Sequence, residues 1–164
     1  MAYVILIISF FLDGILSNYL PFMVNDLSYF TPFLTLVAIG IIYPFFQKQE
    51  KKYFITILIT GFLYDLFYTN LLFTNMIFFG IMGLLISFVY KKINLNPLTY
   101  FIFLFFQLCF YFLLYDFCLF LFNIVPLTVE NVFYQISHSL LLNLIYGEIL
   151  YLLCKYLPHK RSLN

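Results

Sequence analysis

Charged side chains are scarce in this sequence. Only 9% of its 164 residues are Asp, Glu, Lys or Arg, whereas 65% are hydrophobic, and the mean hydropathy is +1.02. A soluble domain carries about 25% charged residues, because water must solvate its surface. The deficit excludes an ordinary soluble globular domain and predicts an integral membrane protein.

The sequence also has few groups that support chemistry. Its three cysteines, Cys109, Cys118 and Cys154, lie inside apolar runs and form no CxxC or Cys/His spacing. This odd number argues against a disulfide framework and a zinc site. The chain has no GxSxG, Walker A or HExxH motif. We therefore expect no enzyme, no catalytic, cofactor or metal site, and no nucleic-acid partner.

Six apolar segments follow one another, at about 3–20, 32–46, 53–72, 73–90, 98–122 and 132–154. Most approach the ~20 residues that a membrane-spanning helix needs, although the second is short. Pro21 is expected to end the first helix. The pattern predicts an all-α fold, a polytopic membrane protein with six transmembrane helices. These form a single domain over residues 1–164, with a short basic tail at 155–164.

Basic residues fall on one side of this six-span arrangement. Two of the three opposite loops hold Asp26 and Glu130, and none of the three holds a Lys or Arg. By the positive-inside rule, both termini are cytoplasmic and the protein lies in the plasma membrane. The residues that set this topology are Lys48, Lys51, Lys52, Lys91, Lys92, Lys155, Lys160 and Arg161.

Three aspartates interrupt the apolar segments at similar depth. Asp13, Asp65 and Asp116 are 52 and 51 residues apart, each on a helix predicted to run outward. A carboxylate at membrane depth costs about 2.5–3.5 kcal/mol, so each should face protein or water. The spacing suggests three parallel helical hairpins. Chance similarity among apolar runs is the alternative.

Small and polar residues accompany these acids at helical spacing. Two stripes follow i, i+4, i+8 and allow close helix approach. They consist of Ser9, Asp13 and Ser17, and of Gly61, Asp65 and Thr69. We predict that these stripes and Asp116 serve helix packing or partner contact.

The sixth segment carries its own polar stripe, with a histidine beside it. The residues are Gln135, Ser139, Asn143 and His138. A polar centre that relays protons or binds a small polar ligand is the alternative to packing. Glu148 lies nearer the cytoplasmic side, where Lys155 can reach toward it by snorkelling.

Residues 61–70, GFLYDLFYTN, give the sequence its most specific resemblance. They resemble the glycine-three-residues-aspartate segment of the MreD family of rod shape-determining membrane proteins. Length, six apolar spans and cytoplasmic termini agree with that family as well. The chain departs from the pattern at Leu72 and Phe73, where many members have glycines, and at Asn75, where many have an aromatic residue or histidine.

This resemblance implies a non-enzymatic scaffold subunit of the bacterial cell-wall elongation machinery, which directs peptidoglycan synthesis and cell shape. Its partner would be a single-pass MreC-like protein, with MreB-type filaments and the RodA/penicillin-binding-protein synthase reached indirectly.

The family is also similar in fold to the six-helix S components of energy-coupling-factor transporters. The alternative function is therefore a small-molecule-binding transporter subunit, with Asp13, Asp116, Gln135 and His138 lining its site. The first segment contains no Ala-x-x-x-Ala docking motif of the kind such subunits often carry.

Overall fold

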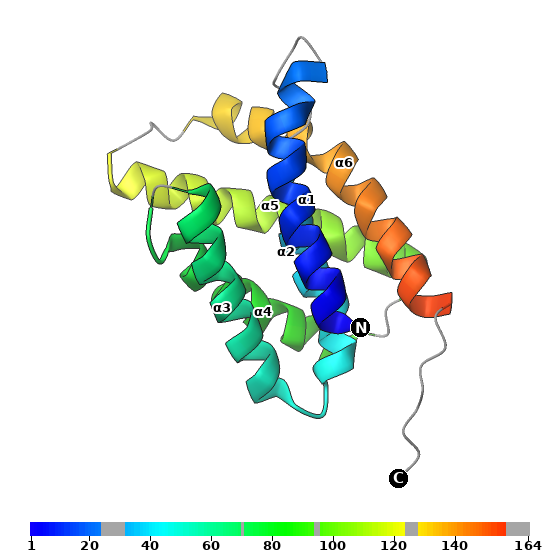
Figure 1. Ribbon diagram of the computed structural model, residues 1–164. Coiled ribbons are helices and arrows are strands. Elements are labelled where there is room, and N and C mark those ends of the chain that lie inside the picture. The colour runs from blue at the N-terminus through cyan, green and yellow to red at the C-terminus, as the bar shows by residue number, and fades with distance from the viewer. Residues whose placement is uncertain (24–31, 70, 94–95, 124–127, 157–164) are drawn as a thin grey trace.

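The computed structural model describes residues 1–23, 32–69, 71–93, 96–123 and 128–156 (Figure 1). This part of the chain contains α-helices and one short 3-10 helix but no strand, which confirms the all-α prediction. The elements are α1 (Ala2–Met23), α2 (Leu34–Ile42), η1 (Tyr43–Phe46), α3 (Glu50–Tyr68), α4 (Thr74–Lys92), α5 (Pro97–Leu121) and α6 (Val129–Tyr156).

Two predicted helix ends are wrong. α1 continues through position 21 to Met23, because a proline in the final turn removes only one hydrogen bond of the helix. α3 ends at Tyr68 rather than near residue 72, since Thr69 is extended. Phe73 then adopts a left-handed conformation with φ 67°, which turns the chain into α4.

Four helices in the described residues are long and apolar enough to cross a membrane. They cover Ala2–Tyr19, Thr74–Lys92, Pro97–Leu121 and Val132–Lys155. The apolar stretch Leu34–Phe46 is shorter. α3 is not one of these four helices, because its first turn is charged and contains Glu50, Lys51 and Lys52.

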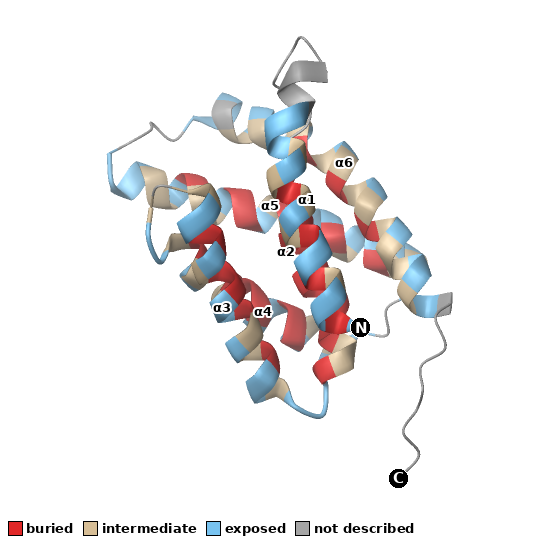
Figure 2. Ribbon diagram, viewed as in Figure 1, coloured by how far each residue is buried: buried red, intermediate tan, exposed pale blue. Residues whose placement is uncertain are grey.

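The short helix α2 forms the centre of the molecule (Figure 2). All nine of its residues are buried, and it packs mainly against α1 and α6. The other helices pair along the chain, α3 with α4 and α5 with α6. At 1.5 Å per residue α2 is only about 14 Å long. It is therefore a core helix, and its first residue lies inside the bundle.

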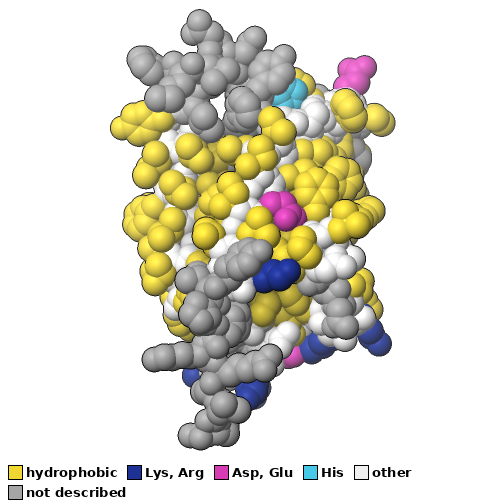
Figure 3. Space-filling model, turned by 90° about the vertical axis from the view of Figure 1, so that its right-hand side faces the viewer, with side chains coloured by type: hydrophobic (Ala, Val, Ile, Leu, Met, Phe, Trp, Pro, Cys, Tyr) yellow, Lys and Arg dark blue, Asp and Glu magenta, His cyan; other side chains and the backbone are white. Residues whose placement is uncertain are grey.

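The two ends of the bundle differ in charge. The N-terminus, the η1–α3 connection and the end of α6 lie at one end, the lower end of Figure 1. Lys side chains gather in the lower half of the face in Figure 3, below a band of hydrophobic side chains. Every described residue of the predicted basic set is exposed, whereas Lys160 and Arg161 lie outside the described residues.

Candidate functional site

Asp65 binds the beginning of α4. Its Oδ1 accepts hydrogen bonds from the Asn75 backbone N–H at 3.0 Å and the Asn75 side-chain amide at 2.8 Å. Its Oδ2 accepts one from the Met76 N–H at 3.1 Å, and the Thr69 hydroxyl donates to Oδ1 at 3.0 Å. The carboxylate is 1% exposed. Asp65 therefore contacts another helix of its own chain.

Asp13 does the same for α2. Its Oδ1 and Oδ2 accept hydrogen bonds from the backbone N–H groups of Leu34 at 2.6 Å and Thr35 at 2.8 Å. The neighbouring N–H of Phe33 donates to Asn143 Oδ1 on α6 at 2.8 Å. Three helices thus meet at the first turn of α2.

Both helices begin with a residue that cannot cap them. The N-cap positions of α2 and α4 are Phe33 and Phe73, and neither makes a side-chain cap hydrogen bond. The first N–H groups of a helix need an acceptor, and the helix dipole favours a negative charge there. In each case a carboxylate on the preceding helix supplies both the hydrogen-bond acceptor and the negative charge. Asp13 and Asp65 are therefore helix caps provided in tertiary structure.

Asp116 departs from this arrangement. It is buried on α5, and its interaction is with the Gln135 side chain of α6 rather than with a helix start. Its Oδ2 has no hydrogen-bond partner among the described residues. The spacing of the three aspartates therefore corresponds to a shared role for the first two only.

Asn75 links three helices, and the sequence reasoning missed it. Its amide donates to Asp65, while its Oδ1 accepts a hydrogen bond from the Tyr111 hydroxyl of α5. On the same helix, Gln107 donates to the Leu36 carbonyl of α2 at 2.8 Å. One sequence feature could have identified Asn75. It is an amide residue ten positions after an intramembrane aspartate, at the start of the next predicted helix.

The predicted stripes on α1 and α3, which contain Asp13 and Asp65, lie mostly at helix contacts. Ser9 is buried and exchanges a hydrogen bond with the Tyr146 hydroxyl of α6 at 2.7 Å. A Cβ at Gly61 would lie 2.6 Å from the Asn75 carbonyl oxygen of α4. Ser17, in contrast, is exposed.

The α6 residues do not converge on one centre. Ser139 and Asn143 are fully buried against the bundle, and Gln135 is half-buried beside Asp116. His138 is half-buried and contacts the Tyr134 ring and carbonyl. The described residues contain no group of three or more His, Cys, Asp or Glu that could hold a metal ion.

A cleft of about 390 Å³ opens next to the Asp13 and Asp65 caps. None of Asp13, Asp116, Gln135 and His138, the residues predicted to bind a ligand, lines it. Its walls come from α1, α3, α5 and the start of α2, and are formed by Gly14, Ser17, Asn18, Pro32, Phe33, Tyr64, Phe67, Tyr68, Thr69, Tyr111 and Tyr115.

Comparison with known proteins gives one match. The family model described as rod shape-determining protein MreD matches residues 1–161. The chain belongs to the MreD family. No curated protein and no solved structure matches it. MreD proteins are integral membrane proteins with a structural role in cell shape, and the apolar helices of this chain agree with that.

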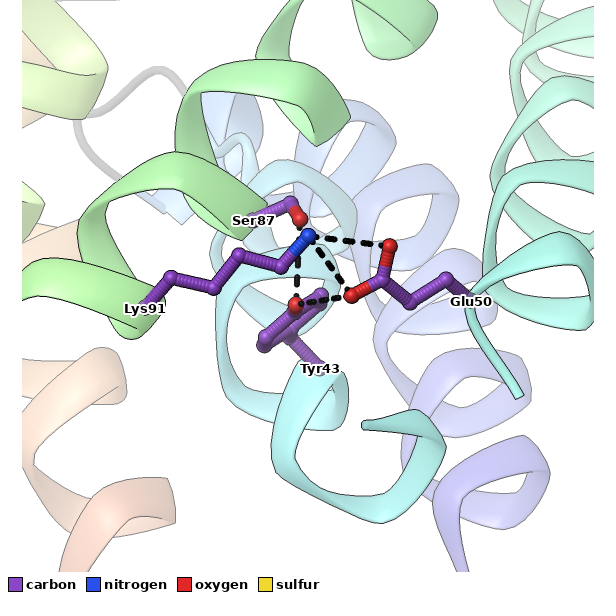
Figure 4. Close-up of polar contacts among 4 residues, drawn as sticks. All are labelled: Tyr43, Glu50, Ser87 and Lys91. Atoms are coloured by element: carbon purple, nitrogen blue, oxygen red, sulfur yellow. Dashed lines mark hydrogen bonds and ion pairs between the residues drawn. The ribbon is translucent and has the colours of Figure 1, made fainter. Parts of the chain in front are cut away.

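The opposite end of this MreD-family chain carries a second polar cluster (Figure 4). Lys91 Nζ on α4 lies 2.8 Å from Glu50 Oε1 and 3.0 Å from Oε2 on α3. The Tyr43 hydroxyl donates to Glu50 at 3.2 Å and pairs with the Ser87 hydroxyl at 3.0 Å. The hydrogen bond from Lys91 lowers the pKa of Glu50 below its ordinary value. The cluster ties α3, α4 and η1 together.

Proposed function

We propose that this chain is a non-enzymatic membrane scaffold subunit of the bacterial cell-wall elongation machinery and binds an MreC-like single-pass protein. MreB-type filaments and the RodA/penicillin-binding-protein synthase are reached through that partner. The family match over residues 1–161 carries the proposal. The role of Asp13 and Asp65 as helix caps supports it, because neither carboxylate is available as a catalytic group.

The proposed topology has six membrane crossings in one domain, of which the second consists of the buried α2 and η1, and both termini lie in the cytoplasm. The clustering of exposed lysines at the end that holds the N-terminus supports this orientation. Single cysteines at Lys48 and Glu130, in a variant without the three native cysteines, test it in intact cells. An impermeant thiol reagent should label position 130 and not position 48. Labelling of position 48 and not of position 130 would show that the protein has the opposite orientation.

Asp65 and Gly61 offer the functional test. We expect Asp65→Ala and Gly61→Leu to reduce co-purification of the MreC-like protein and to disturb rod shape while membrane insertion persists. The reason is that both changes misplace α4 relative to α3. Leu84→Ala is the control, because Leu84 is 62% exposed on the surface of α4. Normal cell shape and an intact complex in both variants would refute the scaffold role of this hairpin.

The second candidate function is binding of a small molecule, as in a transporter subunit. The cleft of about 390 Å³ favours it, since four tyrosines and several hydroxyl and amide side chains line it. A thermal-shift screen of the purified protein against a panel of vitamins tests this function. If a compound stabilises the wild-type protein but not Ser17→Phe, the result would support the cleft as the binding site. If no compound stabilises the protein, the result would count against this second function.

A further inference from the structure

Glu148 on α6 has a polar atom without a partner. Its Oε1 is buried and makes no hydrogen bond with any described residue. Asp13 and Asp65 differ, because both of their carboxylate oxygens accept hydrogen bonds at helix starts. Asp116 has one oxygen unpaired among the described residues as well, but it also interacts with Gln135. An ionisable group inside a membrane span usually pairs with a group of the same bundle or of a partner.

Lys155 does not neutralise Glu148 within this chain. The two residues are seven positions apart, which is about 10 Å along a helix. Among the described residues, the ion pair that forms is the one between Lys91 of α4 and Glu50 of α3. The snorkelling contact expected from the sequence is therefore absent.

The surroundings of Glu148 form an uncovered apolar face. Only 17% of the residues in the α6 span at 132–155 are buried, against 28% to 39% in the other three long spans. Ile145, Ile149 and Leu152 are each more than 40% exposed next to Glu148. Figure 3, which looks onto the side of the molecule that holds α6, shows an acidic side chain with hydrophobic ones around it and a Lys side chain just below it.

A second unsatisfied group lies on the adjoining helix. Tyr100 of α5 is fully buried, and its hydroxyl has no hydrogen-bond partner among the described residues. Its ring stacks on Tyr151 of α6, with the ring centroids 4.6 Å apart. Among the described residues, the α5–α6 pair thus has two polar groups without a partner in the half of the bundle that carries the lysines.

We infer that the face of α6 around Glu148 docks a membrane-spanning helix of a partner protein that carries a Lys or Arg near its cytoplasmic end. The inference rests on the proposed function, which supplies the partner, and on the proposed cytoplasmic location of the lysine-rich end. Such a helix has basic residues at that end by the positive-inside rule. Its long side chain can extend along the apolar face and pair with the carboxylate.

The test uses the full chain co-expressed with the MreC-like protein of the same organism. A photo-crosslinking residue replaces Leu152, one turn from Glu148, or in the control Leu84 on α4. We expect an adduct with the partner from position 152 and none from position 84. Glu148→Gln should weaken the complex about tenfold, the loss typical of one charge-assisted hydrogen bond. A charge exchange completes the test. Glu148→Lys should regain the adduct when the pairing Lys or Arg of the partner is replaced by Glu.

The outcomes separate this inference from the proposed function. If the partner co-purifies but position 152 gives no partner adduct, the docking face is wrong and the scaffold role stands. An adduct with a second copy of the chain, or with lipid only, overturns the docking face as well. If wild-type protein fails to retain the MreC-like protein, both proposals fall. Loss of thermal stability in Glu148→Gln without loss of the adduct would assign Glu148 to packing within the chain.

Discussion

Replacing Asp65 with alanine leaves the first turn of α4 without its acceptor. The carboxylate accepts hydrogen bonds from the Asn75 N–H, the Asn75 side-chain amide and the Met76 N–H. Phe73 at the N-cap position cannot replace it. The site is 1% exposed, so water does not reach these donors in the folded protein.

The size of the effect follows from the number of donors. Side-chain hydrogen bonds in membrane proteins average about 0.6 kcal/mol and reach about 1.7 kcal/mol. For three donors this gives about 2 to 5 kcal/mol. For a chain of this size, each kcal/mol lowers the melting temperature by roughly 2–4 °C. We therefore expect Asp65→Ala to melt about 10 °C below wild type, and Asp65→Asn, which keeps one acceptor oxygen, to lose about half as much.

The assay is thermal unfolding of the purified protein in a mild detergent. Asp116→Asn serves as the matched control, because its carboxylate lies in the same bundle but caps no helix in the described residues. Its melting temperature should change by only a few degrees, roughly 1 kcal/mol. Equal melting temperatures for Asp65→Ala and wild type would refute the capping argument.

Three further predictions concern other contacts. Asp13→Ala should lower the melting temperature and speed amide hydrogen exchange in the first turn of α2, and unchanged exchange would contradict its cap role. Gly61→Ala should destabilise the protein because its Cβ would lie 2.6 Å from α4 backbone, whereas Gly80→Ala should be tolerated because it meets only the end of a leucine side chain at 3.1 Å. The contribution of Glu50 to stability should be present above the ordinary carboxyl pKa of about 4.3 and disappear as pH falls through its lowered pKa. Melting curves of wild type and Glu50→Gln from pH 7 to 3 would then converge at the acid end, and a difference that persists there would contradict the ion pair.

The sequence pattern predicted some residues of the candidate site but not their contacts. The depth and spacing of Asp13 and Asp65 marked both residues as polar groups that needed a partner. Periodicity on one helix does not identify that partner, which lies 10 or 21 residues further along the chain. For the same reason, the sequence marked Asn75 only as a departure from the family pattern. Its two contacts exist only after α3, α4 and α5 have packed.

The sequence by itself determined that the chain is helical and suited to a membrane, because hydropathy over ~20 residues is a local property. It also identified the family, through a short segment around Asp65. Only the tertiary structure decided that α2 is a short, fully buried helix and that preceding helices cap α2 and α4. Apolar character cannot distinguish contact with lipid from contact with other helices, and a cap provided by another helix depends on how the hairpin closes.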